Sequence, residues 1–335
     1  MKLLFIAALA TLTVGCNSAQ NAKGKNMSRE DYENTITATE LKTHLYEFAS
    51  DEMQGRMTGE KGQKLAAEYL RNYYQDLKVA SPIEENNYYQ HIPAQYFERM
   101  KEPKSSENVV AFIKGSEKPD EIIVLSAHYD HVGIENGEIF NGADDDGSGT
   151  IAMLEIAEAF QQAVKDGNGP KRSILFLHVT GEEIGLYGSK YYTENPLFPL
   201  ANTVVNLNTD MIGRIDPDKK HAPNYIYLIG SDKLSQELHD VSEAVAKKYS
   251  DLELDYTYND ENDPNRFYYR SDHYNFAKNN IPIIFYFNGV HEDYHQPTDT
   301  PDKIEYDLYA KRTKLIFQTA WEIANREGRI TADKL

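Results

Sequence analysis

The sequence predicts an α/β fold, in which a central sheet of mostly parallel or mixed strands is covered by helices on both faces. Two observations support this prediction. Short apolar runs bounded by polar residues alternate along the chain with helical patterns. With 335 residues, 40% of them hydrophobic, the chain can also bury a full core. Such alternation is typical of a three-layer sandwich. Because no repeat, low-complexity tract or second linker interrupts it, we expect one domain over residues 36–330.

The expected elements follow one another in order. We predict strands at 121–127, 173–180, 203–209, 224–230 and 281–287, and helices at 148–164, 186–192, 234–248 and 307–325. In open sheets of this kind, functional sites collect beyond the carboxyl ends of the strands.

The first residues, "MKLLFIAALATLTVGC", indicate an export signal over residues 1–16. Lys2 precedes an apolar run that is too short to span a bilayer comfortably, and small residues lead to Cys16. Gly15 and Cys16 resemble the lipobox of bacterial lipoproteins, although Thr13 stands where leucine is usual. We therefore expect a lipidated Cys16, a flexible tether over residues 17–35 and a membrane-anchored lipoprotein of the bacterial cell envelope. The alternative is an ordinary cleaved signal with an incidental cysteine.

Charge excludes some partners. Lys and Arg number 35 against 53 Asp and Glu, which gives a formal charge of −18. Such a chain is not attracted to nucleic acid or to anionic lipid, so we expect membrane contact only through the anchor. Cys16 is the only cysteine, so no disulfide can form within the chain.

Potential metal ligands follow several predicted strands. They are His128 and Asp130, then Glu182 and Glu183, then Asp210, then His291 and His295, together with the aspartates of "NGADDDGSG". Each alone has an ordinary explanation as a cap or a solvated loop residue. Together they bring to one edge of the sheet the oxygen and imidazole donors that zinc accepts. A metal-bound imidazole usually passes its other ring proton to a carboxylate, and Asp130 is placed to orient His128 in this way.

The segment "DEMQGRMTGEKGQKLAAEYL", the strand "NVVAFIKG" and the five ligand segments, in that order, resemble the zinc-dependent exopeptidases with a co-catalytic metal pair. This family includes bacterial leucine-type aminopeptidases, glutamate carboxypeptidase and glutaminyl cyclase, and the resemblance covers most of the chain. It implies two zinc ions. His128 and Asp210 would hold one, Glu183 and His295 the other, and Asp145 would bridge them. His295 is preferred to His291 because it stands before "QPTDT".

The resemblance also implies roles for residues that are not ligands. Glu182 would take a proton from the metal-activated water and deliver it to the leaving amine. Tyr268 would help to hold the oxyanion, the alternative being simple packing. Asp144 and Asp146 would be turn or outer residues, and the Asp145–Asp146 peptide bond is expected to be cis.

Further residues near the site are given other roles or left open. Ser271, Asp272 and His273 would serve as scaffold. We expect Arg270 to pair with an acid rather than to meet a substrate carboxylate. His131 departs from the simplest aminopeptidase pattern and leaves the choice of substrate open.

The sequence thus predicts a metal-dependent aminopeptidase that hydrolyses N-terminal residues from peptides. A glutaminyl cyclase, which keeps one zinc, and a carboxypeptidase are alternatives within the same fold. A non-catalytic surface binding lipoprotein is the alternative from another class. The intact ligand set together with Glu182 favours the enzyme.

Overall fold

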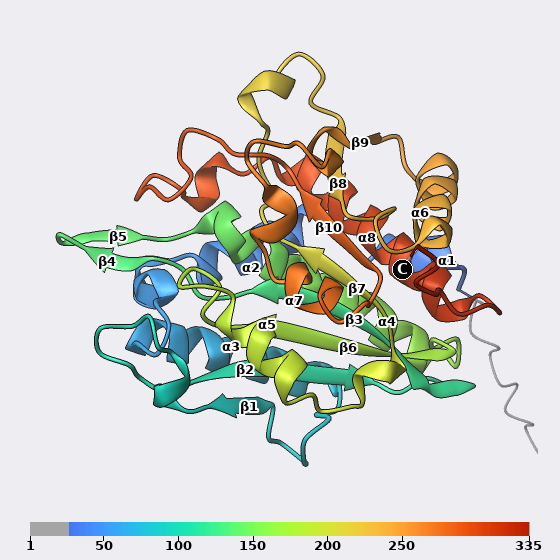
Figure 1. Ribbon diagram of the computed structural model, residues 1–335, viewed down its shortest axis with the longest axis horizontal. Helices are drawn as coiled ribbons and strands as arrows, with labels where there is room; N and C mark the ends of the chain where they lie inside the picture. Colours follow the sequence, from blue (N-terminus) through green and yellow to red (C-terminus); the bar gives the residue numbers. More distant parts are fainter. Residues whose placement is uncertain (1–26, 335) are drawn as a thin grey trace, which may run out of the picture.

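The computed structural model describes residues 27–334 and is built on an eight-stranded sheet (Figure 1). The strands lie in the order β1-β2-β6-β3-β7-β10-β8-β9. Their bounds are β1 Tyr89–Ile92, β2 Ser106–Ile113, β3 Lys118–His128, β6 Arg172–Val179, β7 Thr203–Thr209, β8 Tyr225–Ile229, β9 Glu253–Asp255 and β10 Ile283–Phe287. A separate hairpin joins β4 Gly133–Glu135 to β5 Glu138–Phe140.

The sheet is mixed, and its centre is parallel. Strands β6, β3, β7 and β10 run parallel to one another. Strand β2 is antiparallel to both β1 and β6, and β8 is antiparallel to β10 but parallel to β9. The carboxyl ends of the four central strands therefore meet at one edge, as the sequence predicts.

Helices cover both faces, which confirms the expected layers. They are α1 Arg29–Glu33, α2 Ala38–Phe48, α3 Lys61–Leu77, α4 Gly149–Lys165, α5 Tyr187–Glu194, α6 Gln236–Tyr249, α7 His273–Ala277 and α8 Tyr306–Asn325. Alternate residues of β3 point to opposite faces. Ile123 and Leu125 pack in the core that holds α4 and α8, whereas Val124 packs with Tyr192 of α5 and Phe276 of α7.

The elements with long apolar patterns are confirmed with small shifts at their ends. The five predicted strands correspond to β3, β6, β7, β8 and β10, and the four predicted helices to α4, α5, α6 and α8. The sequence analysis missed the β4–β5 hairpin, which projects at the left of Figure 1, and the short edge strands β1 and β9. These strands have only three or four residues each, too few to show a period.

The folded part begins earlier than residue 36. Within the range expected to be a flexible tether, α1 is capped by Ser28, whose side chain accepts from the Asp31 main-chain N–H at 3.2 Å. Tyr32 is fully buried and stacks on Trp321 of α8, with ring centroids 5.6 Å apart. A five-residue helix has little stability of its own, so its presence depends on this packing.

The predicted signal peptide and Cys16 lie outside the described residues. Among residues 27–334, no helix is both long enough and apolar enough to cross a bilayer.

Candidate metal centre

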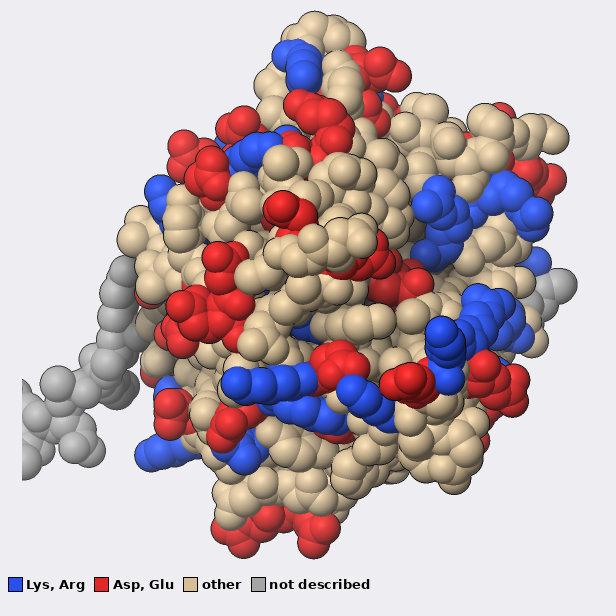
Figure 2. All heavy atoms as spheres, turned by 90° about the vertical axis from the view of Figure 1, so that its left-hand side faces the viewer, with Lys and Arg blue, Asp and Glu red and all other residues tan. Residues whose placement is uncertain are grey.

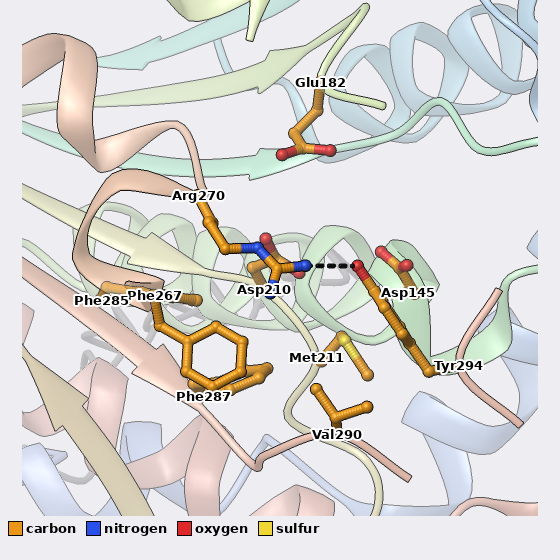
Figure 3. A pocket seen from close by; sticks show the side chains of 10 residues that line it. All are labelled: Asp145, Glu182, Asp210, Met211, Phe267, Arg270, Phe285, Phe287, Val290 and Tyr294. Carbon is orange, nitrogen blue, oxygen red and sulfur yellow. Dashed lines mark hydrogen bonds between the residues drawn. The ribbon is translucent and has the colours of Figure 1, made fainter. Parts of the chain in front are cut away.

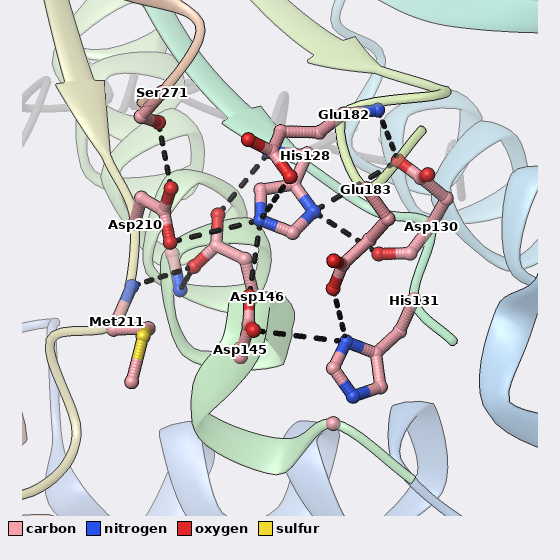
Figure 4. Close-up of polar contacts among 12 residues, drawn as sticks. His128, Asp130, His131, Asp145, Asp146, Glu182, Glu183, Asp210, Met211 and Ser271 are labelled. Atoms are coloured by element: carbon pink, nitrogen blue, oxygen red, sulfur yellow. Dashed lines mark hydrogen bonds and ion pairs between the residues drawn. The ribbon is translucent and has the colours of Figure 1, made fainter. Parts of the chain in front are cut away.

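The predicted ligands come together at the carboxyl edge of the central strands, and Figure 4 shows four of them, His128, Asp145, Glu183 and Asp210. His128 is the last residue of β3, Asp210 follows β7, Glu182 and Glu183 follow β6, His295 lies in the loop after β10, and Asp145 lies in the segment Ala143–Ser148 that leads into α4. Five separate segments thus supply one cluster.

The first half of the centre is buried around His128, whose side chain is 1% exposed. Its Nε2 atom lies 3.2 Å from Asp145 Oδ1, 3.6 Å from Asp210 Oδ1 and 3.9 Å from Glu182 Oε2. Ser271 donates its hydroxyl proton to Asp210 Oδ2 at 2.6 Å. One member of the predicted Ser271–Asp272–His273 scaffold therefore orients a predicted ligand.

The second half is more open. His295 Nε2 lies 3.0 Å from both Asp145 Oδ2 and Glu183 Oε2, and the His295 side chain is 39% exposed. His131 belongs to this half, because its Nδ1 lies 2.7 Å from Glu183 Oε1 and 3.9 Å from Asp145 Oδ2. The two oxygens of Asp145 thus face different halves, as a bridging ligand requires.

Asp146 turns away from Asp145 and fixes main-chain groups. Its Oδ2 accepts from the N–H of His128 at 3.2 Å, and its Oδ1 accepts from Gly149 at 2.9 Å and from Met211 at 3.1 Å. These contacts join the end of β3, the start of α4 and the residue after Asp210. The Asp145–Asp146 peptide bond is cis, as expected.

Asp144 points in a third direction. Its Oδ1 accepts from Gly213 N at 2.7 Å, and its Oδ2 lies 3.1 Å from His291 Nε2. Of the two histidines that follow β10, His295 therefore faces the cluster while His291 supports the aspartate loop. The three adjacent aspartates are tolerated because each meets different partners.

Asp130 has a different role from the one predicted. His128 Nδ1 lies 3.0 Å from the main-chain oxygen of Asp130 and 3.8 Å from its carboxylate. Since a carbonyl only accepts, Nδ1 carries the proton and Nε2 is free to bind a metal. The Asp130 carboxylate instead accepts from Thr58 Oγ1 at 2.8 Å and Glu182 N at 3.2 Å, so it positions the glutamate loop.

The "GRMTG" motif holds together two main-chain segments that border the site. Arg56 is fully buried and donates to the main-chain oxygens of Tyr129, Asn141 and Gly142 at 2.7–2.9 Å. Burial lowers the pKa of Arg56 to about 10, against the raising effect of nearby aspartates. The guanidinium thereby ties the exit of β3 to the aspartate loop.

The donor set fits zinc. Ligand atoms of three overlapping groups lie within 4.8 Å of one another, namely His128–Asp146–Asp210, His128–Glu182–Glu183 and His131–Asp145–Glu183. The other ring nitrogen of His131, Nε2, is buried and has no hydrogen-bond partner. Buried polar atoms without partners are rare in proteins, and a cation held by histidine and carboxylate would satisfy this one.

The adjacent glutamates have opposite pKa shifts. Burial raises the pKa of Glu182 well above its usual value, and the charges of Glu183 and Asp210 raise it further. Burial also raises that of Glu183, but His131 and His295 outweigh it, so the pKa of Glu183 falls below its usual value. Glu182 thus favours a proton while Glu183 favours the anion, a separation typical of acid–base and ligand roles.

Two cavities meet at Glu182. We call the first, of about 30 Å³, the apolar cavity (Figure 3); its walls are Met211, Phe267, Phe285, Phe287 and Val290, with the carboxylates of Asp145, Glu182 and Asp210. The second, of about 530 Å³, we call the basic groove; it contains Glu182, Glu183 and His295 together with Arg99, Lys190, Arg270 and Lys278. Arg270 and Tyr294 line both cavities.

Tyr269 and Tyr294 line the basic groove beside the cluster, whereas Tyr268 lines neither of the two cavities. Tyr268 lines another cavity with Lys233 and Tyr258, whereas Tyr294 stacks on His295 with ring centroids 3.9 Å apart. The sequence analysis missed Tyr294, although its position directly before a predicted ligand was a usable signal.

Comparisons with known proteins agree with this geometry. A model of peptidase family M28 matches residues 108–320. A probable zinc metalloprotease of Pyricularia oryzae is 28% identical over 272 residues, which are 69% of this chain and 52% of that protein. The chain thus spans about half the length of this curated relative.

Solved structures share the fold. A zinc aminopeptidase from Bacillus subtilis superposes with a TM-score of 0.66 and 17% identity, over 90% of this chain and 99% of that one. Porphyromonas gingivalis glutaminyl cyclase gives a TM-score of 0.65 and 18% identity, over 85% and 97% of the two chains.

Proposed function

Since the chain belongs to peptidase family M28, we propose that it is a zinc-dependent aminopeptidase that removes N-terminal residues from peptides. The observation that carries this proposal is the Asp145 carboxylate, whose oxygens lie 3.2 Å from His128 Nε2 and 3.0 Å from His295 Nε2. His128 and Asp210 would hold one zinc ion, Glu183 and His295 the other, and Asp145 would contact both.

Bound zinc would polarise the scissile carbonyl and lower the pKa of a water. Glu182 supplies the proton transfers. No described residue donates a hydrogen bond to its carboxylate, and its raised pKa suits a group that takes a proton from water and returns it to the leaving amine. Asp130 holds the main chain of Glu182 in place.

The apolar cavity supports entry by the N-terminus. Its aromatic walls suit a small apolar side chain, and the carboxylates of Asp145, Glu182 and Asp210 attract an ammonium group. The Bacillus subtilis structure with the same fold is that of a zinc aminopeptidase.

A peptide panel tests the activity and its polarity. We expect free dipeptides and tripeptides to lose their N-terminal residue, N-acetylated peptides to resist, and a zinc chelator to stop hydrolysis. Cleavage of N-acetylated peptides from the C-terminus would establish a carboxypeptidase. Cyclisation of N-terminal glutamine with one bound zinc would establish a glutaminyl cyclase, and no turnover of any substrate would leave a binding protein.

A pair of substitutions separates chemistry from metal binding. Glu182→Gln should keep two zinc ions and the wild-type unfolding temperature, yet lose about 10²- to 10⁴-fold in turnover because the proton acceptor is gone. Glu183→Gln should lose zinc and partly recover in excess zinc. Loss of zinc from the Glu182 variant would mean that the two roles are exchanged.

We also propose that Cys16 carries a lipid, as its lipobox-like setting predicts. The test is Cys16→Ser, which should release the protein from the membrane fraction and abolish lipid labelling. Unchanged membrane fractionation of the serine variant would exclude the anchor.

A further inference from the structure

The basic groove gathers positive charge in an acidic protein. Arg99, Lys190, Arg270 and Lys278 line one cavity beside the metal centre, while the chain as a whole has a formal charge of −18. Figure 2 shows lysine and arginine side chains beside acidic ones on one face of the molecule. With 53 acidic residues available, pairing of each cation with a neighbouring carboxylate would be the ordinary arrangement.

That pairing is largely absent among the described residues. Arg99, Arg270 and Lys278 have no carboxylate within 4.0 Å, and Lys190 has only Glu194, at 4.0 Å. The expectation that Arg270 pairs with an acid is therefore wrong. Its guanidinium lies 5.1 Å from the centroid of the Phe267 ring and donates to Tyr294 Oη at 3.3 Å. These four cations outnumber the two carboxylates of the groove, Glu182 and Glu183, so the groove is suited to an anion.

The position of the groove indicates which part of a substrate it meets. Glu182, Arg270 and Tyr294 line both the apolar cavity and the basic groove, so the two cavities join at the proton-transfer group. A peptide whose N-terminal side chain fills the apolar cavity would extend its remaining residues into the basic groove. Guanidinium and ammonium groups bind carboxylates by charge-assisted hydrogen bonds.

We propose that the basic groove binds a carboxylate on the leaving part of the substrate, close to the scissile bond. This inference rests on the proposed function, because it assumes that the centre cleaves peptides. The carboxylate has two sources with the same chemistry, the free C-terminus of a dipeptide or the side chain of an acidic second residue. Either source makes the protein selective among peptides with the same N-terminal residue.

The test compares four dipeptides that share the N-terminal residue best cleaved in the panel. They end in free alanine, alanine amide, aspartate amide and lysine amide. Relative to alanine amide, we expect kcat/KM to rise roughly three- to tenfold for the substrate that supplies the carboxylate, and the preference to shrink in high salt. A rise with free alanine identifies the C-terminus, and a rise with aspartate amide identifies the side chain.

Variants assign the preference to the groove. Lys190→Gln/Arg270→Gln/Lys278→Gln should bring the ratio of carboxylate to amide substrates close to one. The control Lys114→Gln/Lys165→Gln/Lys247→Gln removes the same charge from exposed positions outside the groove and should keep the ratio. Equal cleavage of all four substrates by the wild type, or an unchanged ratio in the groove variant, would overturn the inference while leaving the peptidase intact. No cleavage of any dipeptide would instead contradict the proposed function.

Discussion

Carboxylates are buried in two regions of this protein, and the two regions compensate the charge differently. At the carboxyl edge of the sheet, Asp144, Asp145 and Asp146 are at most 3% exposed, and their oxygens face main-chain N–H groups and imidazoles. In the helical layer, Glu155 of α4 is 2% exposed, and its Oε1 has no hydrogen-bond partner. The nearest ring nitrogen, His44 Nε2, is 3.9 Å away.

The difference shows two ways of burying an acid. A buried carboxylate must be paired, bound to metal or protonated, since an isolated charge in the interior is very unfavourable. At the sheet edge, Asp145 lies 3.2 Å and 3.0 Å from two imidazole nitrogens, and bound zinc would compensate its charge further. Glu155 uses the third, because burial raises its pKa to about 8. Replacing a carboxylate by an amide should therefore harm function in one region and improve stability in the other.

Asp145→Asn should have the largest effect. The amide offers one neutral oxygen where the carboxylate offers an anionic oxygen to each half, so both zinc sites should weaken. We expect turnover to fall by more than the 10- to 100-fold that loss of an outer partner typically costs, and zinc content to drop below one ion per chain. Zinc analysis with steady-state kinetics measures both.

The control for Asp145→Asn is Asp120→Asn, an exposed change at the other end of β3. It should leave zinc content and turnover unchanged. If Asp145→Asn kept two zinc ions per chain, Asp145 would not bridge the halves. Replacing a buried carboxylate at the sheet edge would then not harm function as the contrast between the two regions predicts.

His131→Asn should have an intermediate effect on the second half alone. His131 Nδ1 lies 2.7 Å from Glu183 Oε1, and losing this contact should weaken zinc binding there about 10- to 100-fold. Activity should return in excess zinc, unlike that of Glu182→Gln. A zinc titration measures the change, with the exposed His91→Asn as the control. An unchanged titration would assign His131 to packing against Gly142, whose added Cβ would lie 2.5 Å from its ring.

The sequence predicts most of the sheet because its central strands are continuous apolar runs. Strand β6, with every residue buried, needs no tertiary information to be recognised. Helix α1 and the β4–β5 hairpin cannot be recognised without such information. The few residues of α1 are held by packing, and those of β4 and β5 by pairing of the two strands. Helix α1, which begins at Arg29, is held by the contact of Tyr32 with Trp321, which no local pattern contains.

The candidate site divides in the same way. The residues that meet in the cluster could be predicted because strand ends and residue types are local properties of the sequence. Side-chain orientation is not local. It decides that Asp130 contacts His128 through its main-chain oxygen. It also decides that Tyr269 and Tyr294 rather than Tyr268 border the site, and that Arg270 has no acidic partner.

Glu155→Gln should have the smallest effect and the opposite sign. In the unfolded chain a glutamate has a pKa of about 4.3, whereas burial raises that of Glu155 to about 8 in the folded state. Between these values the folded protein holds one more proton than the unfolded chain, so the unfolding free energy falls as pH rises. The contribution of Glu155 is complete below the lower pKa and lost above the higher one.

Glutamine does not titrate, so in Glu155→Gln the unfolding free energy should not show the fall with rising pH that Glu155 causes in the wild type. Relative to the wild type, we expect it to gain on the order of 1–3 kcal/mol of unfolding free energy between pH 5 and pH 8, with normal zinc content and turnover. Urea unfolding at the two pH values measures this, with the exposed Glu135→Gln as the control. If Glu155→Gln followed the pH dependence of the wild type, Glu155 would be ionised in the folded protein. A donor or a cation would then have to reach its unpaired oxygen, and both regions would compensate buried carboxylates in the same way.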